Sequence, residues 1–93
     1  MSVIGTVNQQ PNDVLDWDID VSALVEGGDA IASVVATVTP ATGLTVDPIE
    51  TDDATVKLWI GPGTAGSYKI DVKVTTDNGR VKEDEIRVKV KEI

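Results

Sequence analysis

An alternation of apolar and polar residues with a period of two recurs in separate segments of the chain and predicts half-buried β-strands. The clearest of these segments are residues 15–21, 54–60, 68–74 and 86–90. Asn78 and Gly79 separate the last two segments, and this pair favours a tight hairpin turn because both residues tolerate positive φ. Two β-branched runs, residues 30–39 and 44–49, end near proline and glycine and read as further strands. About six to seven short antiparallel strands predict an all-β protein with two packed sheets.

The length and composition of the chain fit one small domain. Its 93 residues are enough for one hydrophobic core. Aromatic residues make up only 3% of the chain, so valine, isoleucine and leucine must fill that core. We expect residues 13–93 to form an immunoglobulin-like β-sandwich domain and residues 1–12 to form an extended N-terminal arm. Alternatively, the apolar residues of this arm add a strand to an exposed sheet edge. Val81 is out of phase with the inward residues from Ile86 onward, which predicts a bulge in the last strand.

The charge of the chain is strongly asymmetric. Residues 1–56 contain ten acidic and no basic residues, whereas residues 57–93 contain eight basic and six acidic residues. A net charge of −8 disfavours nucleic acid as a partner, because duplex binding needs clustered lysine and arginine. The N-terminal sequence has no signal peptide, and no apolar run reaches the roughly 18 residues of a membrane span. We therefore expect neither nucleic acid nor membrane as a partner, and no export by the secretory route.

The residue types needed for common catalytic sites are missing. The chain has no cysteine and no histidine, so it offers no thiolate or imidazole ligand, and its serines have no histidine to activate them. The segment GPGTAG lacks the lysine of a phosphate-binding loop. We predict a protein that is not an enzyme, with no catalytic residue and no cofactor.

The stretch LDWDID places Asp16, Asp18 and Asp20 at every second position. A calcium loop of the EF-hand type needs glycine at its sixth position and a bidentate acid at its twelfth. Counted from Asp16, these positions hold Val21 and Gly27. Alternate side chains on one face of a strand are roughly 6.6 to 7 Å apart, too far for three of them alone to bind one ion. The stretch is therefore predicted to be a strand with an acidic outer face and an apolar inner face, and no metal site.

The three aspartates need opposite charge nearby, because they would otherwise repel one another. Two sources remain open. One is the set of outward basic residues on the last strands, Lys69, Lys73, Arg87 and Lys89. The other is a basic surface on another protein, for which the aspartates would form a docking face.

Trp59 alternates with inward residues of its strand and is predicted to face outward. An exposed indole is a candidate anchor for a protein partner, since tryptophan is enriched among binding hot spots. The alternative is that a loop or the N-terminal arm covers it. The candidate partner-binding residues are thus Trp59, Asp16, Asp18 and Asp20.

Three stretches together, DVLDWDIDVSALVEGGDAIAS, LWIGPGTAGSYKI and TTDNGRVKEDEIRV, carry a family resemblance. In their order and spacing they resemble small immunoglobulin-like virion proteins of tailed phages and prophages, of the fibre-tail adaptor type. The positions that match this pattern are Trp17, Asp20, Gly43, Trp59, Gly63, Gly66, Tyr68, Gly79 and Arg80. Ala36 departs from it, because the second strand of such proteins often carries an aromatic residue there. The resemblance implies structural assembly in a phage particle and no catalytic residues.

Two functions are therefore weighed. The first is a virion structural protein that acts as an adaptor or attachment module in head, tail or fibre assembly. It predicts other virion proteins as partners, possible self-association through edge strands or the N-terminal arm, and a location in the virion after assembly in the host cytoplasm. The second is a bacterial surface adhesion or carbohydrate-binding module, which predicts calcium dependence, export signals and a longer parent chain.

Overall fold

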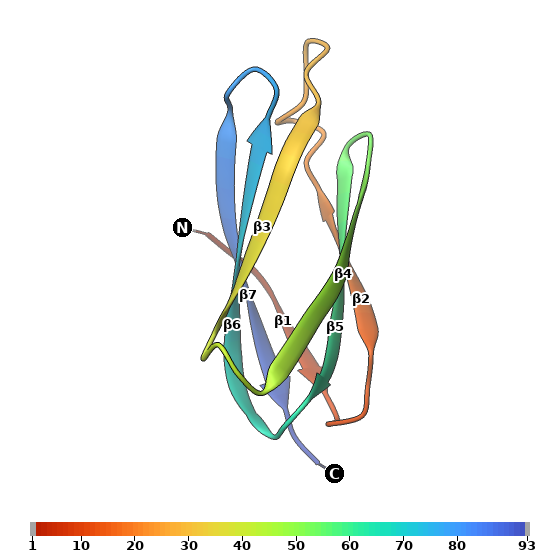
Figure 1. The fold of residues 1–93 in the computed structure, drawn as a ribbon, viewed down its shortest axis with the longest axis vertical. Coiled ribbons are helices and arrows are strands. Elements are labelled where there is room, and N and C mark those ends of the chain that lie inside the picture. Colours follow the sequence, from red (N-terminus) through yellow and green to blue (C-terminus); the bar gives the residue numbers. More distant parts are fainter. Residues whose placement is uncertain (1, 93) are drawn as a thin grey trace.

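The computed structural model describes residues 2–92, and in this range the chain forms seven strands and no helix. The strands are β1 (Ser2–Gln9), β2 (Leu15–Asp20), β3 (Ile31–Thr39), β4 (Leu44–Asp52), β5 (Thr55–Gly63), β6 (Gly66–Thr76) and β7 (Val81–Val90). A four-stranded sheet in the order β1-β7-β6-β3 packs against a three-stranded sheet in the order β2-β5-β4, the left and right layers of Figure 1. The predicted all-β sandwich is confirmed. Among the residues described, no helix could span a membrane.

The N-terminal segment is a strand of the sandwich. β1 pairs with β7 in parallel, whereas all other paired strands in the described range run antiparallel as predicted. This is the second of the two arrangements considered for the segment. Val7 and Gln9 are buried, and a side chain at Gly5 would collide with the ring of Trp17 on β2. β1 and β2 thus close one side of the sandwich, which we call the closed side.

The core is aliphatic, as the composition requires. Its most buried side chains come from the central strands β5, β6 and β7: Val56, Leu58, Ile60, Ile70, Val72, Ile86 and Val88. Full burial of such a side chain contributes about 1.5–3 kcal/mol relative to exposure. On β2 the predicted inner face holds for Trp17, which packs on the core, and for Ile19, which is buried. Leu15 remains 42% exposed because it is the first residue of an edge strand, so its predicted burial is wrong.

The opposite side of the sandwich, formed by the edge strands β3 and β4, is less well covered. Figure 1 shows these two strands running side by side, one from each sheet. Leu44 at the start of β4 is buried. The other inward side chains pack against the core but are only half-buried: Ile31, Val34, Ala36, Val38, Val46 and Ile49. We call this the open side. Neither β3 nor β4 has an aromatic residue, and β3 carries Ala36 at one of its inward positions.

The predicted bulge in the last strand is wrong. β6 and β7 pair without any register shift from Gly66 to Thr75. The inward positions of β7 therefore continue past Ile86 to Asp84 and Lys82. Asp84 is 4% exposed, and the Lys82 ammonium lies 3.7 Å from its carboxylate. A charged pair thus replaces apolar packing at this end, and Val81 faces outward with 52% exposure.

Side chains tie the loops at both ends of the sandwich to the sheets. The Arg80 guanidinium donates to the carbonyl oxygens of Leu24 and Glu26, at 2.8 and 2.9 Å. Asp29 accepts the N–H groups of Ala30 and Asn78. Although its burial opposes ionisation, hydrogen bonds from Thr76 and these N–H groups hold the pKa of Asp29 below its usual value.

At the other end, the Tyr68 hydroxyl donates to the Thr64 carbonyl at 2.7 Å. This bond ties the start of β6 to the loop that precedes it, which gives the tyrosine a structural role. The Tyr68 hydroxyl also fills the space beside Gly43, where a side chain would collide with it.

Candidate protein-docking site

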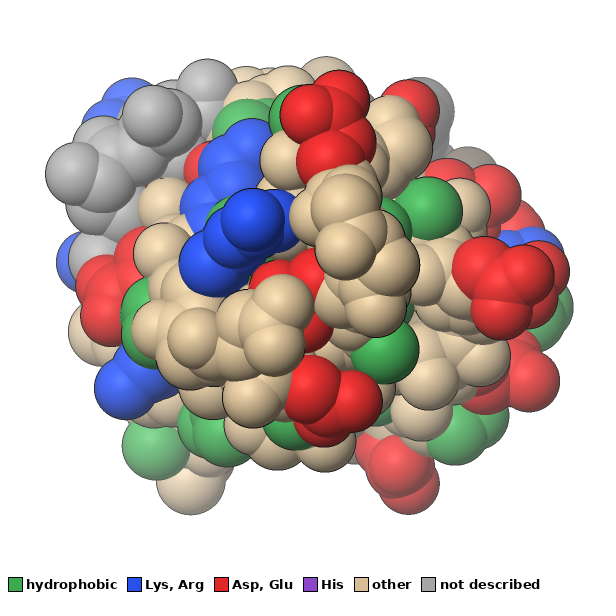
Figure 2. Space-filling model, turned by 90° about the horizontal axis from the view of Figure 1, so that it is seen from above, with side chains coloured by type: hydrophobic (Ala, Val, Ile, Leu, Met, Phe, Trp, Pro, Cys, Tyr) green, Lys and Arg blue, Asp and Glu red, His purple; other side chains and the backbone are tan. Residues whose placement is uncertain are grey.

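The outer surface of the three-stranded sheet gathers half of the acidic residues that lie on strands. Its three strands bring together five carboxylates and one ammonium group around a tryptophan: Asp16, Asp18, Asp20, Glu50, Asp52, Lys57 and Trp59. We call this surface the acidic face. Figure 2, a view along the strands, shows acidic side chains gathered at the right of the molecule, over this sheet. Five of the ten acidic residues in the acidic half of the sequence thus share one face of the fold.

Trp59 lies within the acidic face and is half-buried. Its neighbours Leu58 and Ile60 are fully buried, so the predicted outward phase of Trp59 is confirmed. The indole N–H donates to the Glu50 carboxylate at 2.6 Å. The Lys57 ammonium lies 5.8 Å from the centre of the ring, within the range of a cation–π interaction. Side chains of the face itself therefore hold the indole in one orientation.

Two of the three aspartates of LDWDID are paired within their own sheet. The Lys57 ammonium lies 3.3 Å from Asp16 and 3.9 Å from Asp18. The hydrogen bond to Asp16 and the charge of Asp18 raise the pKa of Lys57 above its usual value. The expected partners on the last strands, Lys69, Lys73, Arg87 and Lys89, belong to the other sheet. That prediction is wrong because β2 pairs with β5 and not with the last strands.

Asp20 has a separate role at the end of β2. Its carboxylate accepts the N–H of Ser22 at 2.9 Å, and hydrogen bonds from Ser22 lower the pKa of Asp20 below its usual value. One lysine cannot neutralise five carboxylates, so the acidic face keeps a net negative charge. Among the residues described, no group of three possible metal ligands is close enough to hold a metal ion.

The outer surface of the four-stranded sheet has a small excess of basic residues, four on β6 and β7 against Asp71, Glu83 and Glu85. Its strands β6 and β7 present four basic side chains, Lys69, Lys73, Arg87 and Lys89, and Lys91 follows directly after β7. Two of these are paired on the same surface: Lys69 lies 3.8 Å from Asp71, and Arg87 lies 2.9 Å from Glu85. We call this surface the basic face.

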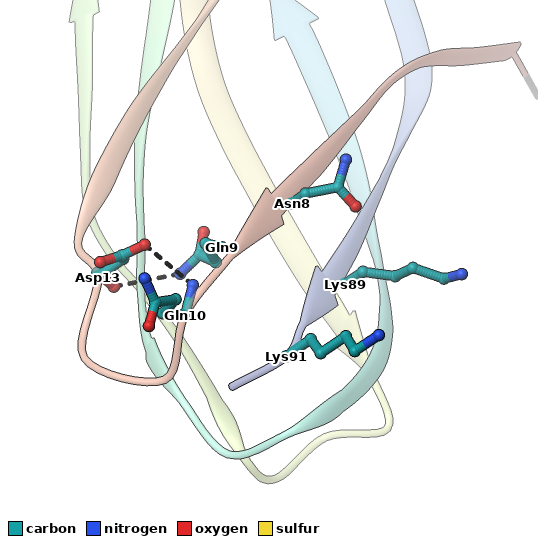
Figure 3. A pocket seen from close by; sticks show the side chains of 6 residues that line it. All are labelled: Asn8, Gln9, Gln10, Asp13, Lys89 and Lys91. Atoms are coloured by element: carbon teal, nitrogen blue, oxygen red, sulfur yellow. Dashed lines mark hydrogen bonds between the residues drawn. The ribbon is translucent and has the colours of Figure 1, made fainter. Parts of the chain in front are cut away.

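The lower end of the basic face is hollowed. Figure 3 shows Lys89 and Lys91 extending from β7 on the same side as Asn8 of β1, while Gln9 and Asp13 meet on the other side of β1. The amide of Gln9 donates to the carbonyl oxygen of Asp13 at 3.1 Å and so fastens the loop that follows β1. The two faces of the sandwich thus differ in charge.

A family match covers most of this two-sheet sandwich. Residues 9–89 match the family described as "Podophage GP4 fiber-tail adaptor protein gp77". The chain belongs to this family. It is therefore a phage structural adaptor of the virion and not an enzyme, as the resemblance implied. No curated protein matches the chain.

For this adaptor the sequence identified only part of the acidic face. Trp59 and the aspartates of β2 were singled out, but Glu50, Asp52 and Lys57 were missed as members of the same surface. The missed signal is the length of β4, which continues to Asp52 beyond its predicted end at residue 49. The register between β4 and β5 then places Glu50 opposite Lys57 and Asp52 opposite Thr55.

Proposed function

We propose that the adaptor uses its acidic face to dock a basic surface of a neighbouring tail or fibre protein, with Trp59 as the central anchor. The observation that carries this proposal is the indole itself. It is half exposed on the outside of the sheet, and Glu50 and Lys57 hold it in place. An interface side chain that is already ordered loses little conformational entropy on binding.

The carboxylates around Trp59 add selectivity. Asp16, Asp18 and Asp20 form one row of the face, and Glu50 and Asp52 form another, with Lys57 between them. A partner that brings lysine or arginine to these rows would gain from their net negative charge. Complementary charge of this kind mainly raises association rates and excludes acidic surfaces.

The location of the adaptor and the proteins that it contacts follow from this docking role. The adaptor acts in the assembled particle, where it contacts a tail protein and a fibre protein, and it joins that particle in the host cytoplasm. Its calcium-dependent rival, a bacterial adhesion module, loses its main support because Asp16 and Asp18 lie beside Lys57.

The test is binding of the purified protein to phage particles that lack it. Trp59→Ala should weaken binding at least about tenfold, in the range of a binding hot spot. The matched control is Val81→Ala, which removes an exposed apolar side chain from the other sheet and should bind like the wild type. Equal binding of Trp59→Ala and wild type would overturn the proposal.

Salt provides a second readout of the same surface. Raising the ionic strength should slow association of the wild type, because the Debye length falls from about 10 Å at 0.1 M to about 3 Å at 1 M. Replacing Asp16, Asp18 and Asp20 together by asparagine should remove much of this dependence. An unchanged salt dependence in the triple variant would contradict a role for this row.

A further inference from the structure

The open side of the sandwich ends in a strand edge without the usual protection against pairing. Among the residues described, β3 pairs with β6 and forms the end of its sheet. Every second residue of such an edge directs its N–H and C=O groups away from the sheet. No charged residue occurs between Ala30 and Val46, and from Ser33 to Thr39 the strand is regular.

The other three edges are each interrupted or charged. β2 carries Asp16, Asp18 and Asp20. β4 contains Pro48, which has no N–H, and its register shifts twice. β1 shifts register between Val3 and Gly5, where Trp17 packs against it. Charges, proline and bulges are the devices that prevent strand addition, so β3 is the edge of this molecule most open to it.

The half-buried residues of the open side indicate what would fit there. The inward side chains of β3, Val34, Ala36 and Val38, and those of β4, Val46 and Ile49, leave apolar surface uncovered between the two sheets. A strand added beside β3 would place every second side chain over this surface. Its remaining side chains would continue the outer row of Ser33, Val35 and Thr37.

We propose that an extended segment of another virion protein pairs with the free edge of β3. The segment is uncharged and has an apolar residue at every second position. Main-chain hydrogen bonds would supply affinity, and the alternating apolar side chains would supply specificity. This inference deepens the adaptor function by giving the protein a second docking surface, separate from the acidic face.

The charge of the molecule argues against a second copy as the occupant. β4 lies beside β3 on the open side. Two copies joined through β3 would therefore bring Asp47, Glu50 and Asp52 of one β4 toward those of the other. A single extended segment adds no such acidic strand. It also suits an edge that carries no charge of its own.

The experiment uses the absence of cysteine from the chain. Val35→Cys places one thiol at the middle of β3, on a side chain that is 55% exposed, and it can be labelled with a photo-crosslinker. The labelled protein is assembled onto adaptor-deficient phage particles, irradiated and analysed by mass spectrometry. Val81→Cys, 52% exposed on the same sheet face but on an internal strand, is the matched control.

The expected result is a crosslink from position 35 to an uncharged segment with alternating apolar residues in another virion protein, at least about five times stronger than from position 81. A crosslink to a second copy, or no excess over the control, would overturn the inference. Hydrogen exchange on the wild type needs no variant: β3 amides should exchange at least about tenfold more slowly in the particle than in the free protein. Unchanged exchange would also overturn it.

The outcome of the crosslinking experiment does not depend on the acidic face. Trp59 lies on the other sheet, so a loss of binding by Trp59→Ala without a crosslink from position 35 would sustain the proposed function and reject the β3 site. The converse result would reject the docking role of Trp59 and sustain the β3 site.

Discussion

The two tryptophans of this adaptor lie on adjacent strands of one sheet and yet belong to different parts of the molecule. In the register of β2 and β5, Asp16 is opposite Trp59 and Trp17 is opposite Leu58. Trp17 points inward and packs against the core and Gly5. Trp59 points outward and is held by Glu50 and Lys57. One residue of strand register therefore separates an indole that packs on the core from one that stays on the surface, where we propose that it anchors a partner.

The surroundings of the two rings show why the roles differ. Within the described residues, Trp17 makes no hydrogen bond to a polar side chain. Its ring occupies the space that a side chain at position 5 would need, and Gly5 leaves that space free. Trp59 is fixed by a hydrogen bond and a cation on a surface that remains in solvent. Removing the first ring should cost folding stability, and removing the second should cost binding.

The largest expected effect is on Trp17. Trp17→Ala should lower the free energy of unfolding by about 3 kcal/mol, since it removes a large ring from the closed side and leaves a cavity. Trp59→Ala should lower it by less than about 1 kcal/mol, as for most surface substitutions. Urea denaturation of both variants measures the contrast. Equal losses would show that Trp59 also belongs to the core.

A smaller but more specific effect is expected at Gly5. Gly5→Val should destabilise the protein by about 2 kcal/mol, because the new side chain would collide with the Trp17 ring and overpack the closed side. Thr6→Val is the matched control, since Thr6 is exposed on the same strand. In a Trp17→Ala background the Gly5→Val penalty should largely disappear. A penalty that persists there would mean that the ring is not the cause.

The period of the sequence predicted these two orientations, because strand alternation depends only on local pattern. It also predicted β2 to β7, the hairpin at Asn78 and Gly79, and the all-β class, whereas β1 was only the alternative to an extended arm. It did not predict which strands pair. The source of positive charge that was considered within the chain for the acidic row of β2 was the set of basic residues on the last strands, whereas β5 supplies Lys57. Strand order is a long-range property that alternation within one strand does not contain.

The same limit explains the errors at strand ends. The alternating pattern assigned Leu15 to the core, but Leu15 is exposed because it is the first residue of an edge strand. Val81 was assigned to a bulge, but it is exposed because it lies on the outer face of β7. The acidic face was incomplete for a related reason. β4 extends to Asp52, and only its pairing with β5 brings Glu50 beside Trp59.

The role of Glu50 tests whether Trp59 is ordered before any partner binds. In a Trp17→Phe background, where Trp59 is the single tryptophan, Glu50→Ala should lower its fluorescence anisotropy and change its emission maximum, because the indole N–H loses its acceptor. Stability should change by no more than about 1 kcal/mol. Glu50→Gln keeps an acceptor oxygen and should retain most of the ordering. Identical spectra for all three proteins would contradict a fixed indole.

The smallest effect is expected from the titration of Lys57. Its pKa in the folded protein lies above the ordinary value of 10.5. The contribution of the charged ammonium to stability is therefore fully present below pH 10.5 and is lost as the pH rises through the pKa of the folded state. Trp59 should therefore gain mobility in strongly alkaline solution, measured as falling anisotropy in the Trp17→Phe background. Lys57→Gln should already show the lower anisotropy at neutral pH and should not change further in the same range. A transition of equal size in Lys57→Gln would assign the alkaline change to a group other than Lys57, and would separate the ordering of Trp59 from the charge beside it.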